Sequence, residues 1–176
     1  MRPAGGRDKG HSFEIQIAKM LSKWVTGCDS DPCLWRSAGS GSFTKITSVT
    51  NLKGDIQAIK EAAYPLMDRV SLECKCYKEI DALSQLDRKK TIMVDWWEQA
   101  RGDAGETHQP LLIMKRNNGK IILVGREKLM EKYTCDLDFV KMILSGEKVI
   151  LVRLEDFLQI NSYTDFITHF DSIYAR

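Results

Sequence analysis

Glu73 and Lys75 are the residues with the clearest potential for chemistry, because they stand two positions apart in a segment with the pattern of a β-strand, residues 70–76. Side chains alternate between the two faces of a strand, so both would emerge on one face, about 6–7 Å apart along the strand. Cys74 and its alternate neighbours are apolar and can face a core. The spacing therefore predicts a carboxylate and an ammonium group presented together.

Asp55 could bring a second carboxylate to the same place, because it enters another predicted strand, residues 55–59. Two carboxylates bind a hard divalent cation such as Mg²⁺ through oxygen and leave coordination positions for water and a phosphate. Such a cation lowers the pKa of its water and stabilises the charge that builds on the phosphate. Lys75 could hold the attacking water or offset that charge.

Other interpretations of these residues stay open. A Glu-x-Lys triplet arises by chance in roughly half of chains of this length, and Glu73 with Lys75 could be a surface ion pair on a half-exposed strand. The rival triplet Asp87-x-Lys89 lies in a polar stretch and is more typical of a solvated surface. Cys28, Cys33, Cys74 and Cys76 could supply four zinc ligands, but small buried thiols are common in apolar strands.

The elements that must position these residues follow from the periodicity of the apolar side chains. Ser12 can cap a helix that carries Glu14 in its first turn. The further predictions are strands at 33–36, 55–59 and 70–76 (the last two able to form a hairpin), a helix at 91–101, a hairpin of 111–114 and 121–124, a helix at 126–132, a strand at 149–152 and one or two helices from 154 to 174. This order predicts an α/β fold with a mixed β-sheet flanked by helices.

Several short motifs follow one another in a recognisable order. They are the helix with Glu14, then Trp35-Arg36-Ser37-Ala38-Gly39-Ser40-Gly41, Gly54-Asp55-Ile56, Leu72-Glu73-Cys74-Lys75, Glu98-Gln99-Ala100 and Arg126-Glu127-Lys128-Leu129. Over about residues 10–133 the sequence resembles the archaeal-type Holliday-junction resolvases and their phage relatives, which are PD-(D/E)XK nucleases. Two features depart from that pattern, since Gly54 stands where a proline is usual and the interval from Asp55 to Glu73 is longer than in compact members.

The resemblance implies a restriction-endonuclease-like fold and a role for each matching residue. Asp55 and Glu73 match the metal ligands, and Glu14 matches the residue that completes the acidic site. Lys75 matches the catalytic lysine, and Gln99 matches a glutamine that faces the site. The implied cofactor is Mg²⁺, for which Mn²⁺ can substitute.

The resemblance also implies DNA contacts and a function. Arg36, Ser40 and Gly41 match a loop that approaches the DNA backbone, while Lys89 and Lys90 would be natural phosphate contacts in a nuclease. The expected activity is a metal-dependent DNA endonuclease that resolves Holliday junctions or other branched DNA in recombination and repair. The alternatives are a nuclease of the same fold that acts on linear or single-stranded DNA, and a non-catalytic DNA-binding protein that retains the fold.

Cleavage at two symmetric points of a junction implies a homodimer. Candidate interface elements are the helix with Trp96 and Trp97, of which only one can point fully inward, and the C-terminal helices with their apolar side chains Phe157, Leu158, Phe166, Ile167 and Phe170. These side chains could equally be core.

Composition sets the remaining expectations. With 176 residues, 43% hydrophobic and 28% charged, the chain suits one compact globular domain, expected at 11–176 after a flexible N-terminus at 1–10. A net charge of +2 does not by itself indicate nucleic acid. The five unevenly spaced cysteines are not expected to form a disulfide framework, and we expect neither a signal peptide nor a membrane-spanning segment. We expect a cytoplasmic protein, microbial or phage-encoded.

Overall fold

The computed structural model describes residues 5–37, 54–77 and 91–174. Along the chain its elements are α1 (Gly5–Thr26), β1 (Leu34–Arg36), β2 (Ile56–Ala58), η1 (Glu61–Ala63), α2 (Tyr64–Met67), β3 (Val70–Tyr77), α3 (Ile92–Ala104), β4 (Gln109–Arg116), β5 (Ile121–Arg126), α4 (Glu127–Met130), η2 (Glu131–Tyr133), β6 (Phe139–Leu144), β7 (Glu147–Arg153), α5 (Leu154–Ile160) and α6 (Tyr163–Tyr174), where η marks a 3₁₀ turn. None of the helices in these ranges combines the length and apolarity needed to cross a membrane.

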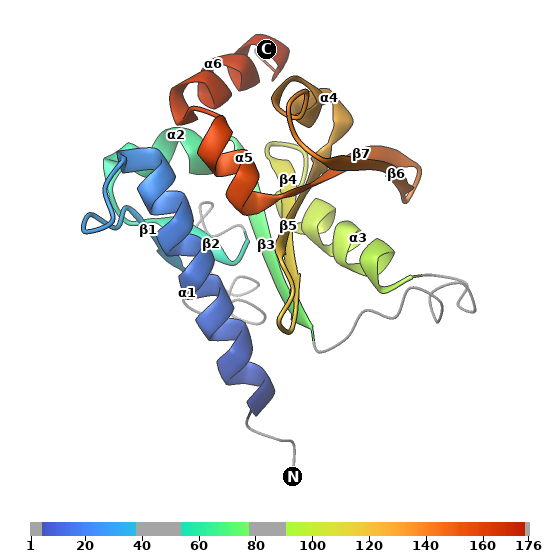
Figure 1. Cartoon of the computed structure of the whole chain (residues 1–176), viewed down its shortest axis with the longest axis horizontal. Helices are drawn as coiled ribbons and strands as arrows, with labels where there is room; N and C mark the ends of the chain where they lie inside the picture. Colours follow the sequence, from blue (N-terminus) through green and yellow to red (C-terminus); the bar gives the residue numbers. More distant parts are fainter. Residues whose placement is uncertain (1–4, 38–53, 78–90, 175–176) are drawn as a thin grey trace.

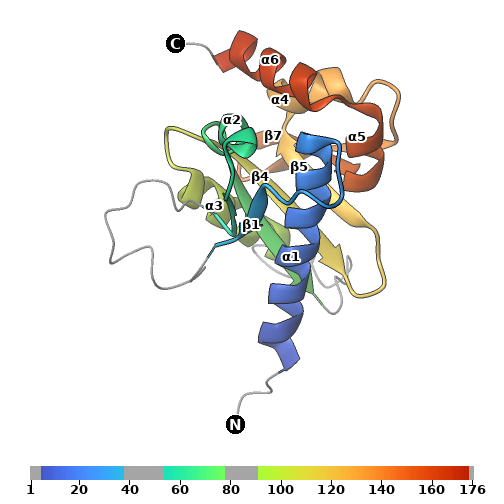
Figure 2. The same cartoon turned by 90° about the vertical axis from the view of Figure 1, so that its left-hand side faces the viewer.

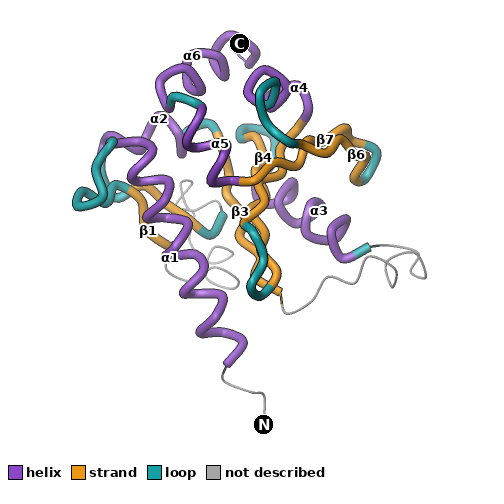
Figure 3. The backbone as a smooth tube through the Cα atoms, in the orientation of Figure 1, coloured by secondary structure: helices purple, strands orange, loops and turns teal. Residues whose placement is uncertain are grey.

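The central feature is a mixed five-stranded sheet in the order β3-β4-β5-β7-β6. β3 runs parallel to β4, and the other neighbouring pairs are antiparallel. β1 and β2 form a separate two-stranded antiparallel sheet. Figures 1 and 3 show helices on both sides of the main sheet, with α1 and α5 on one side and α3 on the other. The predicted α/β fold with a mixed sheet flanked by helices is therefore confirmed.

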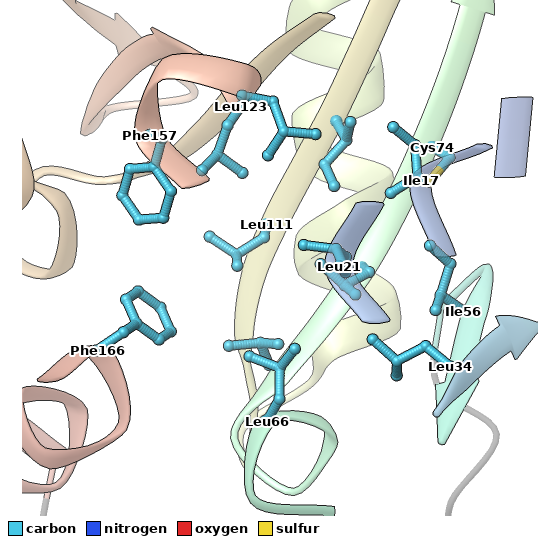
Figure 4. Packing of buried hydrophobic residues seen from close by; sticks show 14 of the residues in the cluster. Ile17, Leu21, Leu34, Ile56, Leu66, Cys74, Leu111, Leu123, Phe157 and Phe166 are labelled. Carbon is cyan, nitrogen blue, oxygen red and sulfur yellow. The ribbon is translucent and has the colours of Figure 1, made fainter. Parts of the chain in front are cut away.

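Two apolar clusters hold these layers together. In the larger one, α1, β1, β2, α5 and α6 pack on one face of the sheet, and Figure 4 shows Ile17, Leu21, Phe157 and Phe166 among the side chains that meet there. In the smaller one, α3 packs on the opposite face against side chains of β4, β5 and β7. Cys74 belongs to the larger cluster, as its alternation along the strand predicted.

The predicted hairpin of residues 55–59 with 70–76 is wrong. β2 pairs with β1, in the register Leu34↔Ala58, and β3 pairs along its whole length with β4, from Val70↔Gln109 to Tyr77↔Arg116. β2 has only three residues, so a full ladder with β4 offers β3 more hydrogen bonds and more apolar contact. β3 is consequently an edge strand of the main sheet.

Two further boundaries differ from the prediction. α1 begins at Gly5 rather than after Ser12, so part of the segment expected to be flexible is helical. β6 was not predicted, because its sequence Phe-Val-Lys-Met-Ile-Leu lacks polar and apolar alternation. It is an edge strand on which most side chains are exposed.

The aromatic residues considered for a dimer interface are mainly core. Trp97 is fully buried and Trp96 is 8% exposed, because Tyr77 at the end of β3 covers Trp96 with a ring-centroid distance of 5.6 Å. The C-terminal side chains Phe157, Phe166 and Phe170 are also buried, and Leu158 and Ile167 pack against them. The sequence could not tell whether these apolar side chains are buried within one chain or between two chains, because both environments favour the same residue types.

Candidate active site

Asp55 lies against the free edge of β3. Its backbone N–H donates to the Leu72 carbonyl at 2.7 Å, and its carboxylate oxygen Oδ2 accepts the backbone N–H of Cys74 at 2.8 Å. The carboxylate thus satisfies a backbone donor that a neighbouring strand would otherwise satisfy. These two bonds hold Asp55 beside Glu73, which stands between Leu72 and Cys74 on β3.

Gly54 makes this close approach possible. It has a φ of +80°, and a Cβ atom at this position would lie 2.5 Å from the Leu72 carbonyl oxygen and 2.9 Å from the Leu72 nitrogen. Any other residue would clash with backbone atoms that cannot move without breaking the sheet. This explains in structural terms why glycine precedes Asp55, where the resemblance would have placed a proline.

Glu73 and Lys75 point from β3 toward the face of the sheet that α3 covers. Glu73 pairs in register with Leu112, a member of the cluster beneath α3. The Glu73 oxygen Oε1 accepts hydrogen bonds from Lys75 Nζ and from Gln99 Nε2, the latter at 2.8 Å. Glu73 is only 2% exposed, so the alternative of a surface ion pair is wrong: the pair exists, but its carboxylate is buried.

Gln99 reaches the site from α3, which is held in place at its first turn and near its middle. Thr91 caps the first turn by accepting the Val94 N–H with its hydroxyl at 3.3 Å. Further along the helix, Trp97 Nε1 donates to Glu147 Oε2 at 3.2 Å. The predicted glutamine therefore contacts the predicted carboxylate.

Glu14 and Arg36 form a second charged pair next to this group. Arg36 Nε donates to Glu14 Oε2 at 3.0 Å, and Glu14 is 8% exposed. β1 carries Arg36, and just after it the Ser37 N–H donates to the Asp55 carbonyl at 2.8 Å. Arg36, expected to contact DNA, thus contacts an acidic residue of the site. The other predicted DNA contacts, Ser40, Gly41, Lys89 and Lys90, lie outside the described residues.

Burial and mutual repulsion make the two central carboxylates reluctant to ionise. Burial raises the pKa of Glu73 to about 7, and the charge of Asp55 acts in the same direction. Burial is also the main cause of the raised pKa of Asp55, with the charge of Glu14 adding to it, although the Cys74 N–H opposes the shift. Perturbed carboxylates gathered in this way are typical of sites that bind cations or transfer protons.

Asp103 is a residue of this neighbourhood that the sequence analysis missed. It lies on α3 one turn after Gln99, and its charge raises the pKa of both Asp55 and Glu73. The spacing of four residues from Gln99 on one helix was the signal that could have identified it. It adds a further negative charge beside the predicted metal ligands.

The donor set fits a hard divalent cation, although each carboxylate now accepts hydrogen bonds from other groups of the protein. In residues 5–37, 54–77 and 91–174, no group of three or more His, Cys, Asp and Glu side chains is arranged to hold a metal ion as it stands. Glu14 is bound by Arg36, and Glu73 by Lys75 and Gln99. Oxygen donors that are buried and carry repelling charges are nevertheless the kind that Mg²⁺ and Mn²⁺ take.

The fold and the site together define a class. A mixed sheet that presents Asp, Glu-x-Lys and a preceding helical Glu is the arrangement of PD-(D/E)XK nucleases, a superfamily that generally uses divalent metals. Residues 5–166 match the family described as "Phage putative PDDEXK endonuclease", and the chain belongs to this family. No curated protein and no solved structure matches the chain. The match extends past residue 133, so β6, β7, α5 and the start of α6 are part of the family's domain.

The raised pKa of Glu73 predicts a pH-dependent stability. Because its pKa is about 7 in the folded protein and near 4.5 when unfolded, the folded state binds the proton more tightly. Stability should therefore fall as the pH rises from about 4.5 to 7, and Glu73→Gln should remove this loss. In the absence of divalent metal, we expect Glu73→Gln to gain about 2–3 kcal/mol over wild type between pH 4.5 and pH 8.

Urea unfolding in EDTA across this pH range measures the difference. Glu61→Gln, which changes an exposed glutamate in η1, controls for the same chemical substitution on the surface. A stability difference between Glu73→Gln and wild type that does not change with pH would contradict the raised pKa of Glu73 in the folded protein.

Proposed function

We propose that the protein is a metal-dependent endodeoxyribonuclease whose active site consists of Asp55, Glu73 and Lys75, with Glu14 and Gln99 beside them. The observation that carries this proposal is the convergence of Asp55 from before β2, Glu73 and Lys75 from β3, and Gln99 from α3 at one sheet edge. Membership of an endonuclease family supports it. The reaction would be hydrolysis of a DNA phosphodiester bond.

Each residue has a distinct task in this reaction. Asp55 and Glu73 would hold Mg²⁺ or Mn²⁺, with Glu14 completing the acidic site directly or through water. When bound, such a cation lowers the pKa of its water and offsets the charge that builds on the phosphate. Lys75 would release Glu73 to the cation and place its ammonium where the attacking water or the phosphate charge needs it. Gln99 would keep the Glu73 carboxylate oriented.

The preferred substrate is proposed to be branched DNA, in the cytoplasm of a phage host. The resemblance to Holliday-junction resolvases supports this finer assignment, which requires two active sites related by two-fold symmetry. A nuclease of the same fold that cuts linear or single-stranded DNA is the alternative. A non-catalytic DNA-binding protein is less consistent with Glu73 and Asp55, because buried neighbouring carboxylates cost stability unless a cation binds them.

β6 is the surface best suited to join two copies. It is the edge strand opposite β3, and its side chains Phe139, Val140 and Ile143 are exposed. Charged side chains on an edge strand usually prevent it from pairing with another chain. The charge of Lys141 on β6 is neutralised, however, because Glu127 and Glu131 both bind its ammonium group at 2.8 Å. Two copies could therefore pair their β6 strands without bringing unpaired charges together.

The dimer and the substrate can be tested together. We expect wild type to sediment as a dimer and to bind a four-way junction more tightly than a linear duplex at the same salt concentration. Val140→Lys/Ile143→Lys should sediment as a monomer and lose the preference for the junction, whereas Ile160→Lys, an exposed apolar residue on α5, should not. A monomeric wild type with equal affinity for both DNAs would exclude the resolvase and leave the nuclease assignment standing.

A further inference from the structure

Trp35 is an exposed indole on the two-stranded sheet of β1 and β2. It is 38% exposed and belongs to neither apolar cluster. Among the described residues, no other aromatic ring stacks on it, whereas Trp24, Trp96 and Trp97 pack in one or other of the two clusters. An indole is one of the largest apolar surfaces that a side chain can offer, so an open one is a candidate for a binding contact.

The face of β1 and β2 that carries Trp35 is opposite to the core. Residues paired across antiparallel strands share a face, and the register places Trp35 opposite Gln57. Leu34 and Ile56 are core side chains of the same two strands, and Figure 4 shows them together with Ile17 of α1. Figures 1 and 2 show α1 lying along β1. Because side chains alternate along a strand, Trp35 and Gln57 point away from α1.

The candidate metal ligand Asp55 lies on the same face as Trp35. The pairing of the two strands continues one residue further, because the Ser37 N–H donates to the Asp55 carbonyl at 2.8 Å. Asp55 stands two residues before Gln57, so their side chains emerge on one face, and Asp55 is a diagonal neighbour of Trp35. Diagonal neighbours in an antiparallel pair are about 7–8 Å apart. The indole is therefore within reach of a substrate that binds at Asp55.

An aromatic surface at this distance from the candidate site is suited to a nucleobase. Aromatic side chains stack on bases of any sequence, because every base has a π-face. Successive bases of a strand are about 3.4 Å apart along the helix axis, so 7–8 Å corresponds to about two nucleotides. Gln57, opposite the indole, has an amide group that can hydrogen-bond to the edge of a base. In an intact duplex the neighbouring bases cover both faces of each base, so only a base that has left the stack can lie on Trp35.

We infer that Trp35 stacks on an unpaired base within about two nucleotides of the cleaved bond. The inference rests on the proposed function and specifies its substrate class, which is DNA with bases outside the helical stack, as at a branch point or in a single strand. Stacking on the indole holds the DNA strand in register with Asp55 and takes no part in the chemical step. An intact linear duplex gains nothing from this contact.

The test compares Trp35→Ala and Trp35→Phe with wild type in EDTA, where binding is measured without cleavage. The affinity of Trp35→Ala for a short single-stranded DNA should fall about tenfold, and its affinity for a blunt linear duplex should change little. Trp35→Phe keeps an aromatic ring and should recover most of the loss. The same loss on a four-way junction would place the unpaired base at the branch point. A merely structural role of Trp35 would weaken the binding of all these DNAs alike.

Tryptophan fluorescence adds a readout that a structural role does not change. A base stacked on Trp35 should quench the emission of wild type when single-stranded DNA binds, whereas Trp35→Phe should bind the same DNA without this quenching. Trp96 and Trp97 are buried and Trp24 packs against the larger cluster, so these three indoles should not respond.

Phe139→Ala is the matched control. Phe139 is 40% exposed, but it lies on β6, at the opposite edge of the main sheet from β3, so its loss should not affect the binding of single-stranded DNA. A Trp35→Ala protein that binds every DNA as tightly as wild type would overturn the inference, as would quenching that persists in Trp35→Phe or a wild type that binds no single-stranded DNA. Binding that depends on Trp35 in a protein without Mg²⁺-dependent cleavage would instead overturn only the proposed nuclease function.

Discussion

Asp55→Asn and Glu73→Gln should each abolish DNA cleavage, with a loss of rate of about 10³-fold or more, while the fold and most of the affinity for DNA persist. Each change removes one negative charge from the cation site and preserves the shape of the side chain. The amide oxygen introduced by Asp55→Asn can still accept the Cys74 N–H. The amide oxygen introduced by Glu73→Gln can still accept a hydrogen bond from Gln99. The effect should therefore fall on metal binding and catalysis.

Cleavage of a labelled DNA in Mg²⁺, together with DNA binding in EDTA, measures the two effects separately. Asp156→Asn, which alters an exposed aspartate on α5 outside the site, serves as the control with the same substitution. Robust Mg²⁺-dependent cleavage by purified Asp55→Asn or Glu73→Gln would place the active site elsewhere in the protein.

Lys75→Met should lower the cleavage rate by about 10²–10³-fold, as is usual when one electrostatic donor to a transition state is lost. Methionine keeps much of the stem and deletes the charge that now neutralises Glu73. Metal binding should persist or become tighter, because a positive charge next to the ligands has gone. Titration of Mn²⁺ into both proteins and single-turnover cleavage test the two halves of this prediction.

A Lys75→Met protein that cuts as fast as wild type would reduce Lys75 to a structural partner of Glu73. Lys60→Met provides the matched control, because Lys60 forms its ion pair with Asp31 on the surface. It should affect neither cleavage nor metal binding.

The sequence predicted the long elements of the fold well, because their apolar periodicity is strong. The helix at 91–101, the hairpin with its Asn-Asn-Gly turn and the two C-terminal helices all occur in the structure. The partner of β3 could not be predicted, because pairing depends on a parallel ladder with β4 that is distant in sequence. β6 was not predicted because its own sequence gives no signal. Both faces of this edge strand are largely exposed, so its side chains do not alternate between polar and apolar.

The candidate site was predicted mainly through resemblance, and geometry added what spacing could not supply. Alternation along β3 correctly placed Glu73 and Lys75 on one face and Cys74 on the other. The closeness of Asp55 depends on Gly54 and on the hydrogen bond to Cys74, neither of which can be read from spacing. Likewise, the contact between Arg36 and Glu14 joins residues from two elements whose packing arises only in the folded protein.

Cleavage of DNA by the purified wild-type protein in the presence and absence of Mg²⁺ tests the central claim most directly. A four-way junction, a linear duplex and a single strand should be offered at equal concentration and salt, with EDTA and the Asp55→Asn protein as parallel controls. We expect cleavage only with Mg²⁺ or Mn²⁺, most rapidly on the junction, and none with Asp55→Asn. Failure to cut any of the three DNAs with either metal, or equal cleavage in EDTA, would contradict the assignment of a metal-dependent nuclease.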